Sequence, residues 1–557
     1  MISRRLYALF GLLATVFGMA VGHLTAALIH PDSSPVLAVG SAVIDSTPAS
    51  LKEWAIKHFE SNGFSIGPID FAARNYDKVV LVGSVLVGVL VLAAVAGILT
   101  LRRFEIGGGM LAALVLVAAA AALTRSGAVF VDVVPSILTL IAGVGALWVL
   151  HRTANDLPLD PRTSTPALAT PVSTGSKTRM TLSGSEEPDV VTESSPTPAR
   201  DPQPSRRGVL IAMGALAAAA TVIGGAGKWI IGLRARPEDI ALPAPVETAP
   251  AFPAGLDKQV PGITPLRVSN ADFYRVDTRL DTPVVSSADW KLTVDGDVGK
   301  KLEISFEELL AMGLVERDIT LTCVSNSVGG KYVGAARWLG VPLMKVLDQA
   351  GIGDQADQML ATDFDGMQIG TPLDLLTDGR EPLIAVGMNG EPLPREHGFP
   401  ARIIVPGLYG FISATKWVER LTMTTYAKDK AYWTKKGWGT DAPIKPSARI
   451  DTPKALSTVD GGQDVIIGGV AWAQNDMGAQ KVQVQVDGGP WQDATMGPDV
   501  NNVYWRQWFH KLEKPDSGQH NVKARVITGD GMTQTDARAE PFPDGSTGLQ
   551  TLVFSVS

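Results

Sequence analysis

Leu321-Thr-Cys-Val-Ser-Asn-Ser-Val-Gly-Gly330 is an apolar run that breaks into polar residues and glycines, and it holds Cys323, the only cysteine in a chain of 557 residues. A lone thiol excludes an intramolecular disulfide, a Cys-x-x-Cys redox pair, an iron–sulfur cluster and a c-type haem. Three roles remain: a small buried hydrophobe, a nucleophile, or one soft ligand to a metal carried by a cofactor. The sequence from Asp318 to Cys323 predicts a strand, which places Cys323 at its C-terminal end, just before a glycine-bearing loop.

Apolar residues are concentrated in the first 232 positions of the chain. A membrane span needs about 20 predominantly apolar residues. Four segments approach or meet this length before residue 153, and a fifth follows later. We predict transmembrane helices over residues 6–28, 78–100, 107–124 and 128–150, and a fifth over 206–232.

Basic residues orient these spans. Arginines precede the first and fifth spans and follow the second, and His151 and Arg152 follow the fourth. By the positive-inside rule all of these ends lie in the cytoplasm. The sequence therefore predicts a multi-pass protein of the cytoplasmic membrane, with residues 31–77 and everything after about residue 233 on the extracytoplasmic side.

The start of the fifth span has two interpretations. Arg206 and Arg207 precede a weakly hydrophobic, alanine-rich helix and resemble a twin-arginine translocation signal. Ordinary positive-inside flanking is the alternative. On either side lie segments predicted as linkers: residues 153–205, rich in Ser, Thr, Pro and charge, as a disordered cytoplasmic linker, and residues 233–265 as a Pro/Ala-rich linker.

The exported half is predicted to hold two domains. Residues 266–450 mix helix and strand signals, including a capping box at Ser305 and a helix between Pro342 and Gly351, and predict an α+β domain. From residue 451 the pattern becomes all-β, as in the alternating Lys481-Val-Gln-Val-Gln-Val, and predicts an immunoglobulin-like sandwich over 451–557. Its tryptophans (Trp472, Trp491, Trp505, Trp508) are expected in cores and interfaces. The formal net charge of −7 and the lack of a basic, aromatic-studded stretch argue against nucleic-acid binding.

Five strings in order give this half a resemblance to a known family. They are Asp272-Phe-Tyr-Arg-Val-Asp277, Leu321-Thr-Cys-Val-Ser-Asn326, Ala336-Arg-Trp-Leu-Gly-Val-Pro342, His397-Gly-Phe-Pro-Ala-Arg402-Ile-Ile-Val-Pro-Gly-Leu-Tyr-Gly410 and Ala414-Thr-Lys-Trp417. Residues 266–557 resemble the molybdopterin-dependent sulfite-oxidase family, which includes bacterial methionine-sulfoxide-reductase catalytic subunits. The resemblance implies a sulfite-oxidase-type cofactor domain followed by a dimerisation-type domain, and a homodimer through residues 451–557.

The same resemblance implies the site. Cys323 would be the catalytic molybdenum ligand, and a thiolate is a soft ligand suited to that metal. The cofactor contacts it implies are Tyr274, Arg275, Cys323, Thr362, His397, Arg402, Thr415 and Lys416. The cofactor carries an anionic phosphate, so the cations among these residues would form charge-assisted hydrogen bonds to it. Taken singly, Arg402, His397 and Lys416 have ordinary structural interpretations as strand, loop and solvated residues.

Departures from the family pattern bear on the substrate. Sulfite oxidases follow the opening aromatic pair with an arginine and then Asn-His, whereas the later positions here are Val276, Asp277 and Thr278. An anionic substrate needs fixed cations, and none of these three residues is a cation. We therefore expect oxygen-atom transfer on a small or protein-bound S-oxide or N-oxide. The alternatives are a sulfite-oxidising enzyme of the same fold and a non-catalytic membrane receptor or assembly protein.

Electron supply is expected to come from outside the chain. The single cysteine excludes a c-type haem, and His23 and His30 on one helix do not make a bis-histidine haem site. The spans are expected to anchor the enzyme in the lipid bilayer and to dock a separate electron carrier, which would be a membrane haem protein, a quinone or a cytochrome.

Overall fold

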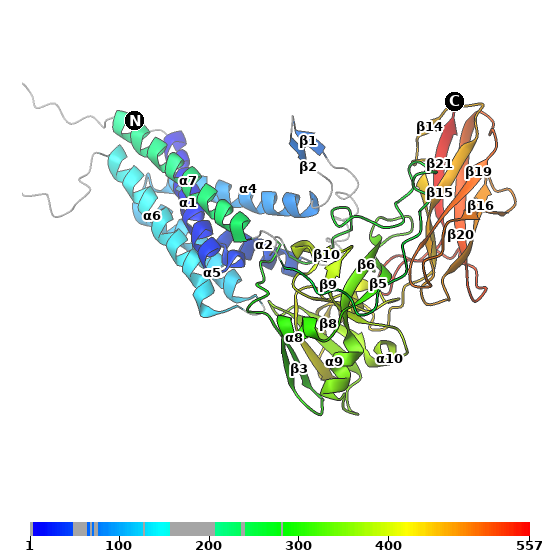
Figure 1. Cartoon of the computed structure of the whole chain (residues 1–557). Helices are drawn as coiled ribbons and strands as arrows, with labels where there is room; N and C mark the ends of the chain where they lie inside the picture. Colours follow the sequence, from blue (N-terminus) through cyan, green and yellow to red (C-terminus); the bar gives the residue numbers. More distant parts are fainter. Residues whose placement is uncertain are drawn as a thin grey trace, which may run out of the picture. The chain divides into compact units, whose positions relative to one another are not determined.

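The computed structural model describes residues 4–47, 64–66, 69–71, 76–125, 128–155, 206–234, 240–279 and 282–557 (Figure 1). The chain divides into two compact units. One is made of Met1–Asp45, Lys78–Thr124 and Val129–Ile231, and the other of Ser46–Asp77, Arg125–Ala128 and Gly232–Ser557. The linker predicted over 153–205 lies outside the described residues from position 156 onward.

The first unit is helical. Its long helices are α1 (Arg4–Leu28), α4 (Tyr76–Leu99), α5 (Phe104–Leu123), α6 (Val134–Ala154) and α7 (Arg206–Arg234), and its shorter elements are η1 (Pro31–Ser33), α2 (Pro35–Ser46) and η3 (Phe130–Val133). In the described part of the chain, five helical segments are long and apolar enough to cross a bilayer. Each overlaps one of the spans predicted from the sequence.

Glycines allow these helices to approach closely. A Cβ atom built at Gly11 of α1 would overlap the backbone of Ala93 on α4, and one at Gly97 of α4 would overlap the carbonyl oxygen of Tyr7. A Cβ at Gly18 of α1 would lie 2.8 Å from the carbonyl oxygen of Thr139 on α6. Small residues at such crossings are typical of helices that associate through backbone contact rather than through long side chains.

The second unit contains one mixed sheet and one antiparallel sheet ahead of its C-terminal part. One has the strand order β4-β3-β12-β7-β8 and the other β10-β9-β6-β5, with β11 beside β9. The strands are β3 (Lys291–Gly296), β4 (Leu302–Ser305), β5 (Val315–Thr322), β6 (Val333–Pro342), β7 (Gln358–Asp363), β8 (Gln368–Pro372), β9 (Leu383–Met388), β10 (Glu391–Pro392), β11 (Arg402–Ile404) and β12 (Val418–Thr424). Strands β12 and β3 pair in parallel.

Short helices connect these strands: α8 (Phe306–Ala311), α9 (Leu343–Ala350), α10 (Leu373–Leu376), η4 (Arg395–His397), α11 (Gly410–Ser413) and α12 (Tyr432–Lys435). The unit also holds an antiparallel pair, β1 (Phe64–Ile66) and β2 (Ile69–Phe71). Two predicted helices are confirmed. Ser305 caps α8, because its Oγ accepts the Glu308 N–H and its own N–H donates to Glu308 Oε2 at 2.8 Å. Gly351 ends α9 with a φ of 70°, a conformation that glycine adopts without strain.

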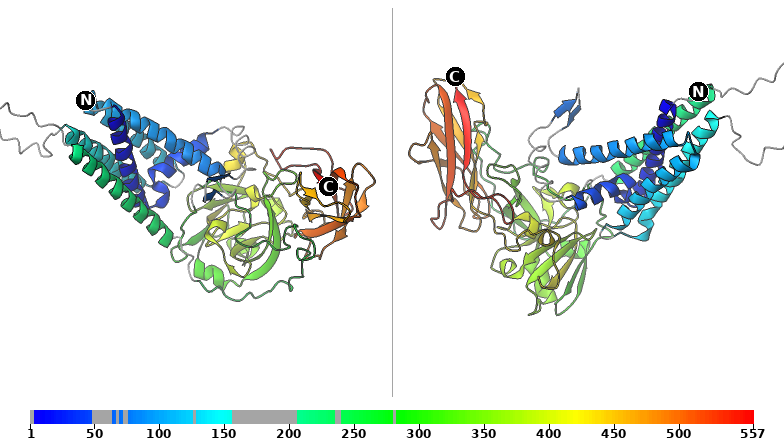
Figure 2. Two further views of the ribbon diagram at one scale, coloured as in Figure 1. Left: turned by 90° about the horizontal axis from the view of Figure 1, so that it is seen from above. Right: turned by 180° about the vertical axis from the view of Figure 1, so that it is seen from behind.

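The C-terminal part is built of two further sheets (Figure 2). Their strand orders are β13-β15-β19-β18 and β14-β21-β20-β16-β17. The strands are β13 (Ser447–Thr452), β14 (Thr458–Val459), β15 (Val465–Trp472), β16 (Ala479–Val486), β17 (Gln492–Asp493), β18 (Thr495–Met496), β19 (Arg506–Leu512), β20 (Gly518–Thr528) and β21 (Gln550–Val556). The alternation predicted for β16 is confirmed, since Val482 and Val484 are buried between more exposed neighbours.

The two parts of the second unit contribute to a common core across position 450, while the C-terminal sheets also bury a core of their own that includes Val482, Trp508 and Phe554. Trp505 is fully buried, and its Nε1–H donates to the carbonyl of Leu266 at 2.7 Å. Tyr504 donates to the same carbonyl at 3.0 Å, and the N–H of Thr320 in β5 donates to Val503 at 3.1 Å. Aromatic residues from the C-terminal part therefore complete the core of the preceding sheets.

The predicted linker over 233–265 also differs from the structure. Residue 240 begins a described segment that lies along β5, and Glu247 pairs in parallel with Val315. The N–H of Val246 donates to Leu314 at 2.8 Å, and the N–H of Glu316 donates to Glu247 at 2.9 Å. Strand β5 is at the edge of its sheet, and an extended, proline-rich chain covers an exposed edge without continuing the sheet.

Candidate cofactor site

Cys323 directly follows β5, as predicted from the sequence. Its N–H donates to the carbonyl of Tyr332 at 2.9 Å, and its carbonyl accepts the N–H of Asn326 at 3.0 Å. The side chain of Asn326 in turn accepts the N–H of Tyr332 at 2.9 Å. These bonds close the loop between β5 and β6 and fix the cysteine at the end of the strand.

The thiol of Cys323 is 8% exposed, and its Sγ lies 3.0 Å from the hydroxyl oxygen of Ser325. A glycine is required nearby, because a Cβ atom at Gly330 would lie 2.5 Å from Oδ1 of Asn326. The loop is therefore packed tightly enough to restrict the position of the sulfur atom. That is the property expected of a metal ligand supported by its surroundings.

Two tyrosines lie near this thiol. Burial raises the pKa of Tyr274 far above its ordinary value, the negative charge of Cys323 raises it further, and Arg402 opposes the effect. Burial also raises the pKa of Tyr409 to about 12, with additional contributions from Asp544 and Cys323. Both phenols are therefore protonated at neutral pH and can donate hydrogen bonds.

Arg402 is a buried cation in β11. It is 5% exposed, and its guanidinium donates to the carbonyls of His397 at 3.1 Å and Ala414 at 3.4 Å. Its Nε has no hydrogen-bond partner among the described residues. Burial lowers the pKa of Arg402 to about 10, and the Tyr274 hydroxyl counteracts this lowering. The guanidinium remains charged at neutral pH, and a buried charge is costly unless an anion compensates it.

A second pair of cations shares one carboxylate. Asp277 accepts hydrogen bonds from Arg275 at 2.7 Å and from Lys416 at 2.8 Å. The side chains are 17% exposed at Arg275, 6% at Asp277 and 10% at Lys416. Burial lowers the pKa of Lys416 to about 8, against the opposing effect of Asp277. Lys416 also donates to the carbonyl of Glu396 at 3.3 Å.

His397 is held as a neutral ring. Its Nε2 lies 2.9 Å from the carbonyl of Asn270, which only accepts, so Nε2 carries the hydrogen and Nδ1 remains an acceptor. Burial lowers the pKa of His397 to about 4, and the charges of Arg402 and Lys416 act in the same direction. Phe273 packs edge-on against the ring, with the centroids 5.6 Å apart.

The two predicted threonines differ in their surroundings. The carbonyl of Thr415 accepts the N–H of Ile403 at 2.8 Å, next to Arg402, and its buried hydroxyl has no partner among the described residues. Thr362 lies in β7 and pairs with Gln368 of β8. Within the described chain, no hydrogen bond links its side chain to the cations described above. Thr415 therefore belongs to this cluster of residues, and Thr362 stays a sequence prediction.

The residues present fit a bound anionic cofactor. Arg275, Arg402 and Lys416 bring three positive charges, and Asp277 brings one negative charge. A largely buried excess of positive charge, together with the partnerless Arg402 Nε and Thr415 hydroxyl, is costly unless a ligand supplies acceptors. A phosphate-bearing group supplies both the charge and the acceptors.

Comparison with known proteins identifies this ligand. Residues 279–433 match the family model described as the oxidoreductase molybdopterin binding domain. Sulfite oxidase of Rattus norvegicus is 29% identical over 307 residues, which cover 47% of this chain and 56% of that protein. Nitrate reductase 1 (NADH) of Arabidopsis thaliana is 28% identical over 177 residues, which cover 27% of this chain and 19% of that protein.

Among solved structures, the sulfane dehydrogenase SoxCD of Paracoccus pantotrophus is 23% identical, with a TM-score of 0.44, and the match covers 50% of this chain and 80% of that one. The chain spans about half the length of the sulfite oxidases it matches. The fold and the site define a molybdopterin-binding oxidoreductase domain with the molybdenum cofactor as its ligand. Over about half of its length the chain is similar to the sulfite oxidases, which are molybdopterin-dependent oxidoreductases. The relatives named here are enzymes, which gives no support to the expected alternative of a non-catalytic receptor.

Sequence reasoning missed three residues of the site. In the sequence Asp277 stands out only as a departure from the family pattern, although a carboxylate two positions after Arg275 is a signal for a local ion pair. Tyr409 lies in the segment from His397 to Gly410, where no pattern distinguishes it from its neighbours. Ser325 lies two residues after Cys323, close enough in sequence for its hydroxyl to have been a candidate partner of the thiol.

Proposed function

We propose that this chain is a membrane-anchored enzyme that removes an oxygen atom from a neutral S-oxide or N-oxide, small or protein-bound, outside the cytoplasm. The observation that carries the proposal is the bridging position of Asp277. Its carboxylate engages both Arg275 and Lys416, at 2.7 and 2.8 Å. Asp277 thereby takes up part of the charge of these two cations, so less positive charge remains for an anionic substrate in addition to the anionic cofactor, which favours a neutral substrate.

Each residue of the cluster has a role in this proposal. Cys323 would ligate the molybdenum, and Arg402, Thr415 and His397 would hold the pterin and its phosphate, with Arg275 and Lys416 around it. When bound, the cofactor would supply a metal that can take up an oxygen atom while giving up two electrons, or return the atom while regaining them. The net reaction is balanced, because one sulfoxide, two electrons and two protons give one sulfide and one water molecule.

Tyr409 has the properties of a hydrogen-bond donor to the substrate oxygen. Its hydroxyl oxygen accepts the N–H of Lys445 at 3.4 Å, which leaves its own hydrogen available. The raised pKa of about 12 keeps that hydrogen in place at neutral pH. A donor that remains protonated can polarise an S–O bond and stabilise negative charge on the oxygen as the bond breaks.

Location and partners are part of the same proposal. The five apolar helices would cross the cytoplasmic membrane in the orientation given by the arginines at their ends. The C-terminal sheets would form an immunoglobulin-like sandwich of the dimerisation type, and a separate carrier would bring electrons. A reporter fused after residue 557 is expected to be active only on the extracytoplasmic side, and a cytoplasmic signal there would refute five crossings.

The direct test compares substrates on purified full-length protein. With reduced viologen as donor, we expect reduction of dimethyl sulfoxide, methionine sulfoxide or trimethylamine N-oxide, and molybdenum at about one atom per chain by elemental analysis. The Cys323→Ser variant is expected to lose this activity. Metal-free protein from a molybdenum-replete host would contradict the proposal.

Sulfite oxidation is the second candidate, because the sulfite oxidases are 25–29% identical to this chain and the cluster retains excess positive charge. Asp277→Asn separates the two functions. Removing the carboxylate releases Arg275 and Lys416, so sulfite oxidation measured with ferricyanide should rise while S-oxide reduction does not. Wild-type protein that oxidises sulfite faster than it reduces every S-oxide and N-oxide tested would decide for the second candidate.

A further inference from the structure

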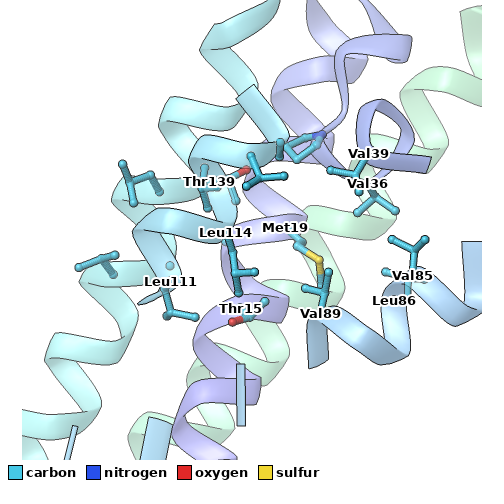
Figure 3. A pocket seen from close by; sticks show the side chains of 18 residues that line it. Thr15, Met19, Val36, Val39, Val85, Leu86, Val89, Leu111, Leu114 and Thr139 are labelled. Carbon is cyan, nitrogen blue, oxygen red and sulfur yellow. The ribbon is translucent and has the colours of Figure 1, made fainter. Parts of the chain in front are cut away.

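An apolar cavity of about 130 Å³ lies inside the helical unit (Figure 3). It is surrounded by α1, α2, α4, α5 and α6, and the side chains that line it include Met19, Val36, Val89, Leu111 and Leu114. The helices approach closely at glycines, both away from this space at Gly11 and Gly97 and at its wall at Gly18. A dry cavity of about 150 Å³ with similar walls holds a benzene ring, so this one is of the size for a single six-membered ring.

One polar atom in the wall is distinctive. The hydroxyl of Thr15 on α1 is buried and has no hydrogen-bond partner among the described residues. Other threonines of these helices donate to a carbonyl one turn earlier: Thr25 to Val21 at 2.8 Å, Thr139 to Pro135 at 2.8 Å and Thr221 to Ala217 at 3.0 Å. Thr15 departs from this pattern at the position where its helix borders the cavity (Figure 3).

Thr139 on α6 lies across the same cavity (Figure 3). Because its hydrogen is given to Pro135, its hydroxyl can only accept further hydrogen bonds. The donor that the wall offers is therefore Thr15. A donor that lacks a partner in an apolar cavity calls for a ligand that carries an acceptor.

This requirement separates the candidate occupants. A saturated acyl chain fits the apolar walls but has no acceptor for Thr15. A buried water molecule typically makes about three hydrogen bonds, and these two threonine hydroxyls supply at most two. A ring that bears carbonyl oxygens matches the size, the apolar walls and the donor together.

We propose that this cavity binds the ring of a membrane quinone, with the Thr15 hydroxyl donating to a ring carbonyl. This inference rests on the proposed membrane location and on the proposed reductase activity, which needs two electrons per turnover. A quinol supplies both electrons and both protons: one quinol and one sulfoxide give one quinone, one sulfide and one water molecule, so the quinol is oxidised as the sulfoxide is reduced. The single cysteine excludes an iron–sulfur cluster or c-type haem as a resident donor, so a carrier that dissolves in the membrane suits this chain.

The test uses full-length protein in nanodiscs of quinone-free lipid. The probe is a photoreactive azidobenzoquinone with a ten-carbon tail, competed with the unmodified quinone, and labelled peptides are mapped by mass spectrometry. We expect saturable labelling of segments that contain Met19 or Leu114. Thr15→Val, which keeps the shape but removes the donor, should raise the half-saturating concentration at least fivefold, and Leu114→Trp, which fills the cavity, should abolish specific labelling.

Thr25→Val is the matched control, because its hydroxyl already bonds to Val21 on the same helix and does not line the cavity. It should label as wild type. Labelling that is absent, or that is equal in Thr15→Val, Leu114→Trp and wild type, would overturn the assignment. Viologen-driven S-oxide reduction by the same preparations tests the proposed function separately: activity without specific labelling rejects only the quinone site, and labelling without activity rejects only the proposed reaction.

Discussion

Replacing Arg402 with methionine is predicted to stabilise the cofactor-free protein while preventing cofactor binding. The buried guanidinium donates to two carbonyls but leaves Nε without a partner in the described chain. Its charge is therefore held in place for a ligand. Methionine keeps much of the volume and removes the charge.

The magnitude follows from the pKa of Arg402. Each tenfold change in proton affinity is worth about 1.4 kcal/mol, so lowering from 12.5 to about 10 corresponds to a burial cost of about 3 kcal/mol. Against this, the carbonyls of His397 and Ala414 lose a donor, at about 1 kcal/mol each. The net effect is a gain of about 1 kcal/mol, or roughly 1–2 °C in the thermal midpoint of a unit of this size.

The assay is thermal unfolding of detergent-solubilised full-length protein from a host that cannot make the molybdenum cofactor. Arg402→Met is expected to raise the midpoint of this apoprotein, and the same variant from a normal host is expected to contain little molybdenum. Arg337→Met is the control, because Arg337 binds Asp318 through two hydrogen bonds of 2.9 and 2.8 Å and its loss should lower the midpoint. A fall of several degrees in Arg402→Met apoprotein would refute the idea that this charge is uncompensated.

Four further outcomes are expected. Cys323→Ser should lower oxygen-atom-transfer activity at least a hundredfold with an unchanged circular dichroism spectrum, because serine is a harder ligand. Normal activity in this variant would show that Cys323 does not ligate the metal. Burial lowers the pKa of His397 from 6.5 to about 4, so the unfolded chain binds more protons between these values and apoprotein stability should fall by about 3 kcal/mol from pH 7 to pH 4. In denaturant titrations the His397→Asn variant should lose much less stability than the wild type between pH 7 and pH 4. An equal loss in the variant and the wild type would contradict the role given to His397. Trp505→Phe should cost about 1–2 kcal/mol in urea unfolding through loss of its 2.7 Å hydrogen bond, and no measurable cost would mean that this bond adds nothing to the shared core. Gly97→Val should lower the thermal midpoint of the helical unit. Gly83→Val on the same helix should not, because no described atom lies within 4 Å of a Cβ added there. Equal effects of the two substitutions would count against a close α1–α4 contact.

The features that depend on local pattern could be predicted from the sequence. The long apolar helices follow from runs of about 20 residues, and the capped helix at Ser305 follows from two side chains three positions apart. Cys323 was placed at a strand end because the apolar run before it stops at polar residues and glycines. The alternating segment Lys481-Val-Gln-Val-Gln-Val lies within β16 for the same reason.

What depends on pairing between distant segments could not be predicted. Lys416 and Asp277 are 139 positions apart, and no periodicity indicates that they meet. The contact across position 450 could not be predicted for a related reason. Alternation shows which side chains of a strand are buried, but it does not show that Trp505 packs beside β5, a strand more than 180 residues earlier. The resemblance to a known family supplied the site residues that spacing alone could not.

The loop that follows Cys323 is held by a residue that is synthesised much later. The hydroxyl of Ser546 donates to the carbonyl of Asn326 at 2.7 Å, and the two residues are 220 positions apart in the sequence. At 5–20 residues per second, a ribosome needs roughly 10–45 s to travel that distance. Throughout this interval the emerging chain already contains Cys323 but lacks the hydrogen bond that secures the adjoining loop. The pocket for a cofactor is therefore finished only after Ser546 has been synthesised, so the timing of synthesis bears on cofactor loading as well as affinity does.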